Sequence, residues 1–239
     1  MFKRWDFFMK LAISSEILAV FDEICSLLAP DACYLVGGIV RDTLYGKKSH
    51  DIDIATSCHP KKVREIFPDC LYFPKYGTTS FKKDGFHVTI ASLRKETSYL
   101  DYRHPSEIEF IKDIHIDYLR RDFTINALYA TSSLDLLDPS QKGIADLKDG
   151  IIRVIGRPEI RFLEDPLRII RAKRFSLAMS FSVEKEAADY MMSHLELLRL
   201  LKPSKIKEEV KKCPSSFQEE LKESLSLSFA YSKESAELK

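Results

Sequence analysis

Hydrophobic and polar positions follow two different periods along the chain. Apolar side chains recur three and four residues apart in some segments, which predicts helices, and alternate with polar ones in others, which predicts strands. The predicted helices are residues 14–29, 39–45, 60–67 and 117–129. The predicted strands are residues 34–36, 51–54, 107–111 and 134–137, with a hairpin over 78–93 that turns at Asp84-Gly85 and a polar loop over 94–106.

From about residue 157 the pattern is helical almost to the end of the chain. Mixed helices and strands followed by helices alone predict an α+β protein. We expect a head over residues 1–140 and an all-helical part over residues 141–239.

Composition narrows the class of protein only slightly. The net charge of +1 leaves no overall basic field, so a nucleic-acid surface would have to be local, and the basic stretch from Arg153 to Arg174 is the candidate. The five cysteines include no C-x-x-C pair, which favours a reduced, cytoplasmic setting. No apolar run approaches the roughly 18 residues of a membrane span, so we expect no membrane partner.

A glycine pair and an aspartate pair lie close together in the predicted head. Gly37 and Gly38 lack Cβ atoms and let the backbone approach a phosphate, to which Arg41 adds a charged donor. Asp51 and Asp53 share one face of the predicted strand, where two carboxylates require a cation such as Mg²⁺. Each pair alone is also explained by a tight turn or a solvated strand face. Together they favour metal-dependent chemistry on a nucleoside triphosphate.

Two further motifs carry polar residues at helical spacing. In the first, Asp122 and Asn126 share a face and can bind a ribose hydroxyl or brace Arg121, which can reach a phosphate; an exposed helix start with a local ion pair is the alternative. In the second, Asp165 before Pro166 is a good helix cap. Capping does not explain three arginines spaced three residues apart, Arg168, Arg171 and Arg174.

The motifs LVGGIVRD and DID, RRDFTINAL, and EDPLRIIRAKRF occur in this order, and GIADLKDGIIRVIG lies between the last two. From about residue 17 to about residue 181 the chain resembles the class II tRNA nucleotidyltransferases, the CCA-adding enzymes, and their relatives the bacterial poly(A) polymerases. The resemblance implies a polymerase-beta-like head followed by a helical neck. It also implies template-independent addition of C and A to the 3′ end of tRNA, with release of pyrophosphate.

The same resemblance assigns roles to individual residues. It implies that two Mg²⁺ ions bind Asp51 and Asp53, with CTP and ATP as substrates, and that Glu109 on an adjacent strand is a candidate third ligand. The residues that it places at the nucleotide are Gly38, Arg41 and Arg121 as contacts, Asp165 and Arg168 as the base-selecting pair, and Arg171 and Arg174 as the rest of the pocket.

The loop and the C-terminal part bear on the product and on the partner. Residues 88–105 resemble the flexible loop of enzymes that complete CCA, although a disordered connection is the alternative. Residues 201–213 resemble a weakened last neck motif, and family members usually continue well beyond this point. We therefore expect contact with the tRNA acceptor end, helped by a partner protein or a second copy of the chain. A poly(A) polymerase and a non-catalytic RNA-binding remnant are the rival functions.

Overall fold

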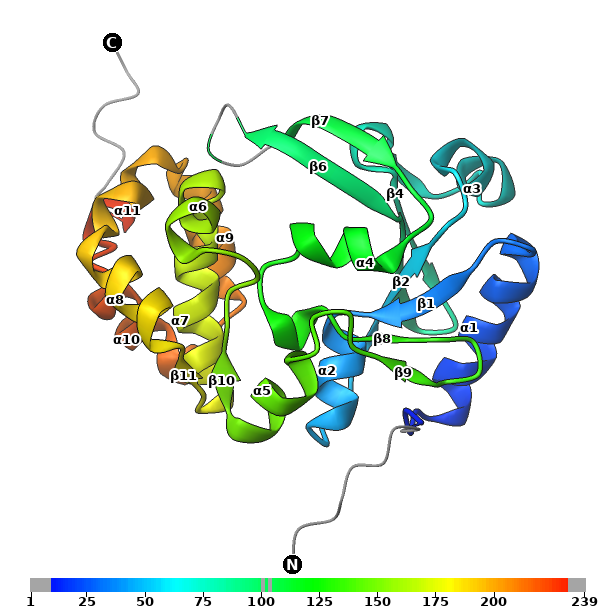
Figure 1. Ribbon diagram of the computed structural model, residues 1–239, viewed down its shortest axis with the longest axis horizontal. Helices are drawn as coiled ribbons and strands as arrows, with labels where there is room; N and C mark the ends of the chain where they lie inside the picture. Colours follow the sequence, from blue (N-terminus) through cyan, green and yellow to red (C-terminus); the bar gives the residue numbers. More distant parts are fainter. Residues whose placement is uncertain (1–9, 100–101, 103–104, 232–239) are drawn as a thin grey trace, which may run out of the picture. The chain divides into compact units, whose positions relative to one another are not determined.

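The computed structural model describes residues 10–99, 102 and 105–231 (Figure 1). The chain divides into two compact units. The first holds residues up to 97 together with 107–147, and the second holds residues 98–106 and those from 148 onward.

A seven-stranded mixed sheet forms the centre of the first unit, with the strand order β3-β4-β5-β2-β1-β8-β9. Its strands are β1 (Cys33–Val36), β2 (Asp51–Thr56), β3 (Leu71–Phe73), β4 (Thr78–Lys83), β5 (Phe86–Ser92), β8 (Tyr129–Ala130) and β9 (Leu136–Leu137). β2 and β5 are parallel, and the other neighbouring strands are antiparallel. The predicted hairpin over 78–93 is confirmed, since Asp84 and Gly85 make its turn with φ of 47° and 83°.

Three helices of the first unit pack against its sheet (Figure 1). They are α1 (Ser15–Leu28), α2 (Gly38–Leu44) and α3 (Pro60–Ile66). Ser14 caps α1 by accepting a hydrogen bond from the Ile17 amide. α1 packs against β1 and α3, whereas α2 packs against β1 and β2. The glycine pair and the aspartate pair are thereby fixed on adjoining elements.

The prediction of a loop over 94–106 is wrong. β6 (Arg94–Tyr99) and β7 (Pro105–Phe110) form a separate two-stranded ribbon (Figure 1). The side chains of β6 are mostly polar, so this strand lacks the alternation that marks a half-buried strand. The strand predicted over 107–111 is confirmed as most of β7. Part of the loop motif, residues 100–101 and 103–104, lies outside the described residues.

The prediction of a helix over 117–129 is also wrong. The helix α4 (Ile114–Asp117) ends as that segment begins, and two 3-10 turns (Tyr118–Arg120 and Thr124–Asn126) lead into β8. Between them Arg121 and Phe123 have extended backbone, with ψ of 163° and 150°. From Phe123 to Tyr129 the apolar residues are fully buried core residues, so their spacing reflects the core and not a helical face.

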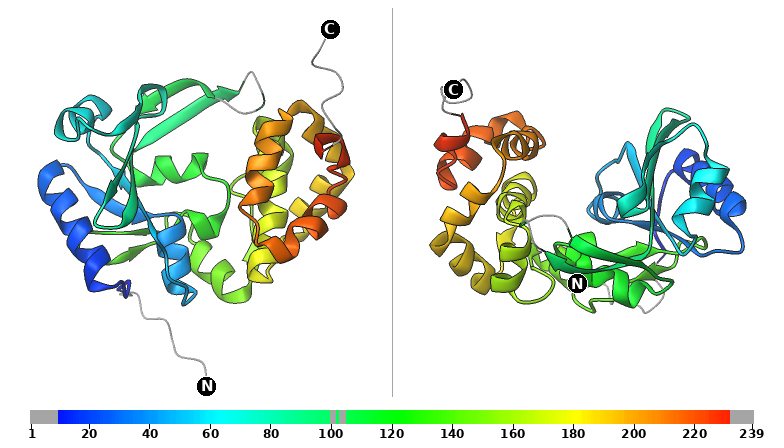
Figure 2. Two further views of the ribbon diagram at one scale, coloured as in Figure 1. Left: turned by 180° about the vertical axis from the view of Figure 1, so that it is seen from behind. Right: turned by 90° about the horizontal axis from the view of Figure 1, so that it is seen from above.

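Between residues 158 and 231 the second unit is helical apart from one short strand, as the sequence predicted. Its helices are α6 (Pro158–Glu164), α7 (Leu167–Met179), α8 (Lys185–Ser193), α9 (Pro203–Lys211), α10 (Gln218–Ser224) and α11 (Ser228–Tyr231). α5 (Gly143–Asp149) spans the boundary between the units, and β10 (Ile151–Ile152) pairs in parallel with β11 (Ser182–Val183). α7 packs against α6, α9 and α10 (Figure 2). The α+β class is confirmed, and no helix of the described part is long and apolar enough to cross a bilayer.

Candidate active site

The two aspartates of β2 lie on one face of the strand. Ile52 and Ile54 point to the opposite face, where they are 0% and 1% exposed. The Asp51 side chain is largely exposed, and its Oδ1 lies 3.8 Å from Nδ1 of His87 on β5. Asp53 is partly buried. Alternation along β2 therefore anchors the strand in the core and presents both carboxylates together.

The glycine pair turns the chain directly beside Asp53. Gly37 has φ of 74° and ψ of −131°, a conformation that a residue with a side chain rarely adopts. A Cβ atom at Gly37 would lie 3.5 Å from Asp53 Oδ2, and one at Gly38 would lie 4.0 Å from the same atom. The turn thus leaves bare backbone next to the carboxylate, where a phosphate can approach.

The electrostatics of Asp53 favour a bound cation. Burial raises the pKa of the Asp53 carboxyl above its usual value, Arg121 opposes the rise, and the negative charge of Asp51 adds to it. A divalent cation between the two carboxylates would stabilise the buried charge of Asp53 and offset its repulsion by Asp51, so the pair fits Mg²⁺. Among the described residues no group of three or more His, Cys, Asp or Glu is placed to hold a metal. Substrate phosphates and water would supply the remaining ligands.

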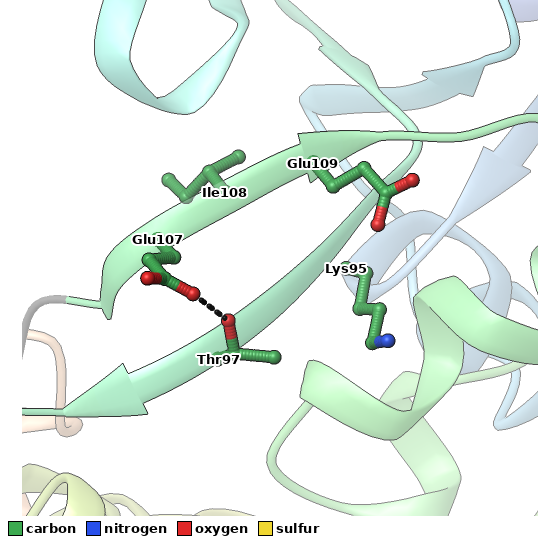
Figure 3. Close-up of a pocket in the computed structure, with 5 residues that line it drawn as sticks. All are labelled: Lys95, Thr97, Glu107, Ile108 and Glu109. Carbon is green, nitrogen blue, oxygen red and sulfur yellow. Dashed lines mark hydrogen bonds between the residues drawn. The ribbon is translucent and has the colours of Figure 1, made fainter.

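The predicted third ligand does not lie beside β2, whose neighbours in the sheet are β1 and β5. Glu109 is on β7 of the ribbon, so its assignment to an adjacent strand is wrong. It lines a pocket of about 390 Å³ on the ribbon (Figure 3). The other lining residues are Lys95, Thr97, Glu107 and Ile108.

A chain of hydrogen bonds holds Arg41. Its Nη1 donates to Asn126 Oδ1 at 2.6 Å, and Asn126 Nδ2 donates to Asp122 Oδ1 at 3.1 Å. Asp42 accepts from the Nε and Nη2 of Arg41 at 2.8 and 2.9 Å. Asp122 therefore braces Asn126 and, through it, Arg41. The sequence had suggested Arg121 as the residue that is braced.

Arg121 is held instead by two residues that the sequence did not single out. Asp117 Oδ2 accepts from the Nε and Nη2 of Arg121 at 3.3 and 3.1 Å, and the Tyr129 hydroxyl accepts from Nε at 2.8 Å. The i, i+4 spacing of Asp117 and Arg121 was a usable signal. Tyr129 lies in β8, and its position in the sequence gave no signal of a contact with Arg121.

We expect Asp117 to make the first unit sensitive to acid. Burial opposes its ionisation, but Arg120 and Arg121 hold the pKa of Asp117 well below its usual range. The unfolded value is about 3.9, so the stabilisation is complete above that pH and is lost as the pH falls toward the folded value. Asp117→Asn should lower the free energy of unfolding by about 3 kcal/mol at neutral pH. It should also flatten the loss of stability below about pH 4, measured by denaturant unfolding across a pH series. If the free energy of unfolding falls equally steeply with pH in the variant and the wild type, the role assigned to Asp117 is wrong.

In the second unit, Asp165 and Arg168 are both fixed at the start of α7. Asp165 Oδ1 accepts a hydrogen bond from the Leu167 amide at 3.1 Å, so the predicted capping contact is present. Arg168 is 5% exposed, and its Nη1 donates to Glu164 Oε2 at 3.1 Å and to the Arg161 carbonyl at 2.8 Å. Glu164, which the sequence did not single out, orients this guanidinium.

One buried carboxylate on α9 holds the other two arginines of α7. Glu209 is 1% exposed, and its Oε1 lies 2.8 Å from Arg174 and 3.9 Å from Arg171. Lys212 also pairs with Glu209, at 3.0 Å. The sequence gave no signal for this contact, because the partners lie on separate helices.

The predicted site residues thus fall into two groups. The first unit holds Gly37, Gly38, Arg41, Asp51, Asp53, Arg121, Asp122 and Asn126, and the second unit holds Asp165, Arg168, Arg171 and Arg174. Within each group, hydrogen bonds or ion pairs fix the arginines. The first group combines a carboxylate pair, bare backbone and two held guanidinium groups, a set suited to a metal-bound triphosphate.

A head domain with a carboxylate pair beside a glycine turn is the class that this fold and site define. The family model described as the poly A polymerase head domain matches residues 33–153, about half of the chain. The chain belongs to this family, and the family prediction made from the motifs is confirmed.

Several known proteins are similar to the chain. The CCA-adding enzyme of Levilactobacillus brevis is 41% identical over 170 residues, which cover 70% of this chain and 42% of the relative. A crystal structure of the Bacillus stearothermophilus CCA-adding enzyme in complex with CTP aligns with a TM-score of 0.72 at 30% identity, covering 83% of this chain and 47% of that one. A tRNA nucleotidyltransferase complexed with a primer tRNA and an incoming ATP analog aligns with a TM-score of 0.68 at 28% identity, covering 88% and 60%. The chain therefore spans about two fifths of the curated relative's length.

Proposed function

We propose that this chain adds C and A nucleotides from CTP and ATP to the 3′ end of tRNA without a template. The observation that carries the proposal is the Asp51–Asp53 pair beside the Gly37-Gly38 turn. Its support from similarity is that the relatives described above are CCA-adding enzymes, one of them solved with CTP. We assign the chemistry to a head over residues 1–140 and base selection to a helical neck over residues 141–239.

In the proposed reaction the 3′-oxygen of the RNA bonds to the α-phosphorus of the nucleotide. The bond from that phosphorus to the oxygen bridging to the β-phosphate breaks, and pyrophosphate leaves. Two Mg²⁺ ions held by Asp51 and Asp53 would supply charge neutralisation and activate the attacking hydroxyl. Arg41 and Arg121 bind the phosphates, and the turn at Gly37 leaves room for them.

The neck residues Asp165 and Arg168 are proposed to select the base. Cytosine and adenine both present an amino donor beside a ring-nitrogen acceptor. A carboxylate beside a guanidinium presents the complementary acceptor and donor, and uracil and guanine reverse the pattern. A mismatched base leaves buried polar groups unpaired, so discrimination can be strong. Arg171 and Arg174 complete the pocket in this proposal.

A primer-extension assay tests the function directly. The purified chain is incubated with Mg²⁺, CTP and ATP and a tRNA that lacks its terminal CCA, and the products are resolved at single-nucleotide resolution. Addition of three residues supports the proposal. An open-ended A tail would identify a poly(A) polymerase. No addition, with RNA binding retained, would indicate a non-catalytic RNA-binding protein.

The same assay addresses the partner. An acceptor-stem minihelix and full tRNA are compared, and the mass of the chain in solution is measured alongside. Similar rates would favour contact with the acceptor end alone. A requirement for a second copy of the chain, or for an added protein fraction, would favour the dimer or the helper protein.

A further inference from the structure

Asp117 is a buried carboxylate of the first unit that accepts several hydrogen bonds, and no proposed chemical step involves it. It is 0% exposed. Its Oδ1 accepts from the Arg94 amide at 3.0 Å and from Arg120 Nε at 2.9 Å. Its Oδ2 accepts from Arg121 and, at 2.7 Å, from the Tyr129 hydroxyl. One oxygen therefore faces the start of β6, and the other faces the arginine of the candidate site.

The Tyr129 hydroxyl completes the arrangement around Arg121. It donates to Asp117 and accepts from Arg121 Nε, while the guanidinium carbon lies 4.9 Å from the centre of the tyrosine ring. Tyr129 is itself 0% exposed and belongs to a cluster with Val36 and Tyr34. A guanidinium bonded to a carboxylate along one edge and to a fixed hydroxyl loses most of its freedom to rotate.

Arg121 is also tied to the strand that leads into the glycine turn. Its partner Tyr129 pairs with Val36 of β1, the residue directly before Gly37. An arginine that must meet a triphosphate beside Asp53 binds it best when its direction is set in advance, because less side-chain entropy is lost on binding.

We propose that Asp117 and Tyr129 are positioning residues, which aim the Arg121 guanidinium at the phosphates of the incoming nucleoside triphosphate. The inference rests on the proposed function, since that is what places a triphosphate at Arg121. Neither Asp117 nor Tyr129 touches the nucleotide. Both act through Arg121.

The test is a double-mutant cycle read by CTP binding in the presence of Mg²⁺ and without RNA. Tyr129→Phe keeps the buried ring and removes the hydroxyl, so the fold should survive. The matched control is Tyr34→Phe, which removes a hydroxyl from a neighbouring ring of the same cluster. Tyr129→Phe is expected to raise the Kd for CTP about tenfold, the low end for one hydrogen bond to a charged group. The control should leave the Kd within about twofold.

The second arm repeats Tyr129→Phe in an Arg121→Ala background. Arg121→Ala alone should raise the Kd by about tenfold or more, and Tyr129→Phe should then add less than about twofold. An equal factor in both backgrounds would mean a purely structural role and overturn the proposal. An unchanged Kd in either single variant would overturn it as well. If the cycle is non-additive but the wild type extends no RNA, the positioning role stands and the proposed function fails.

Discussion

Asp53→Asn and Asp51→Asn are each expected to reduce nucleotide addition by about a thousandfold or more. Each replacement removes half of the negative charge that would hold Mg²⁺ beside the glycine turn, and charge stabilisation is the largest contribution to catalysis in such sites. The measurement is single-turnover extension with Mg²⁺ at saturating CTP. Asp22→Asn, on the exposed side of α1, is the matched control and should keep full activity.

Thermal melting of the same variants distinguishes a loss of catalysis from a loss of folding stability. The raised pKa of Asp53 means that its ionised form destabilises the fold at neutral pH without a cation, so Asp53→Asn should melt at or above the wild-type temperature in chelator. Added Mg²⁺ should raise the melting temperature of the wild type and not that of the variant. Normal turnover in either aspartate variant would eliminate the proposed metal site.

The second large effect is expected at Asp165. Asp165→Asn keeps an oxygen that can accept the Leu167 amide, but its amide nitrogen cannot accept the amino group of cytosine or adenine. Discrimination against UTP should therefore fall by about tenfold to a hundredfold with little change in stability. The measurement is competition between CTP and UTP for one primer.

Comparison of Asp165→Ala with Asp165→Asn measures the contribution of the helix cap to stability. It loses the hydrogen bond to Leu167 and should cost about 1 kcal/mol of stability in addition to the lost selectivity. If Asp165 only caps α7, the asparagine variant will discriminate between bases like the wild type, and only the alanine variant will differ, by its lower melting temperature.

Local patterns in the sequence were sufficient for β2 and for the hairpin of β4 and β5. A strand with one polar face alternates strictly, and a turn that needs positive φ selects Asp84-Gly85, so neighbouring residues determine these structures. The carboxylate pair and the glycine turn were predictable for the same reason. The chemistry of each depends on residues that adjoin in the chain.

Tyr129 and Glu209, which hold arginines of the candidate site, could not be predicted in this way. Helical spacing pointed to Asp122 as the brace of Arg121, yet the segment folds as turns that bring Arg121 to Asp117 and Tyr129. Glu209 reaches Arg174 from another helix. The polar strand β6 has no apolar face in its sequence, so it was missed, whereas β7 was predicted from its alternation. For Tyr129 and Glu209, contacts between distant segments decide the structure.

The strand pairing of the first unit also sets the order in which the site can assemble. β2 pairs in parallel with β5 only after the intervening crossover has folded, and β1 pairs with β8 through Val36 and Tyr129, which lie far apart in the sequence. Such long-range pairings form slowly and late. On the ribosome, the aspartates and glycines emerge well before Tyr129 does. A nascent chain therefore gains an oriented Arg121 only once β8 has emerged, so nucleotide binding would report completion of this sheet during synthesis.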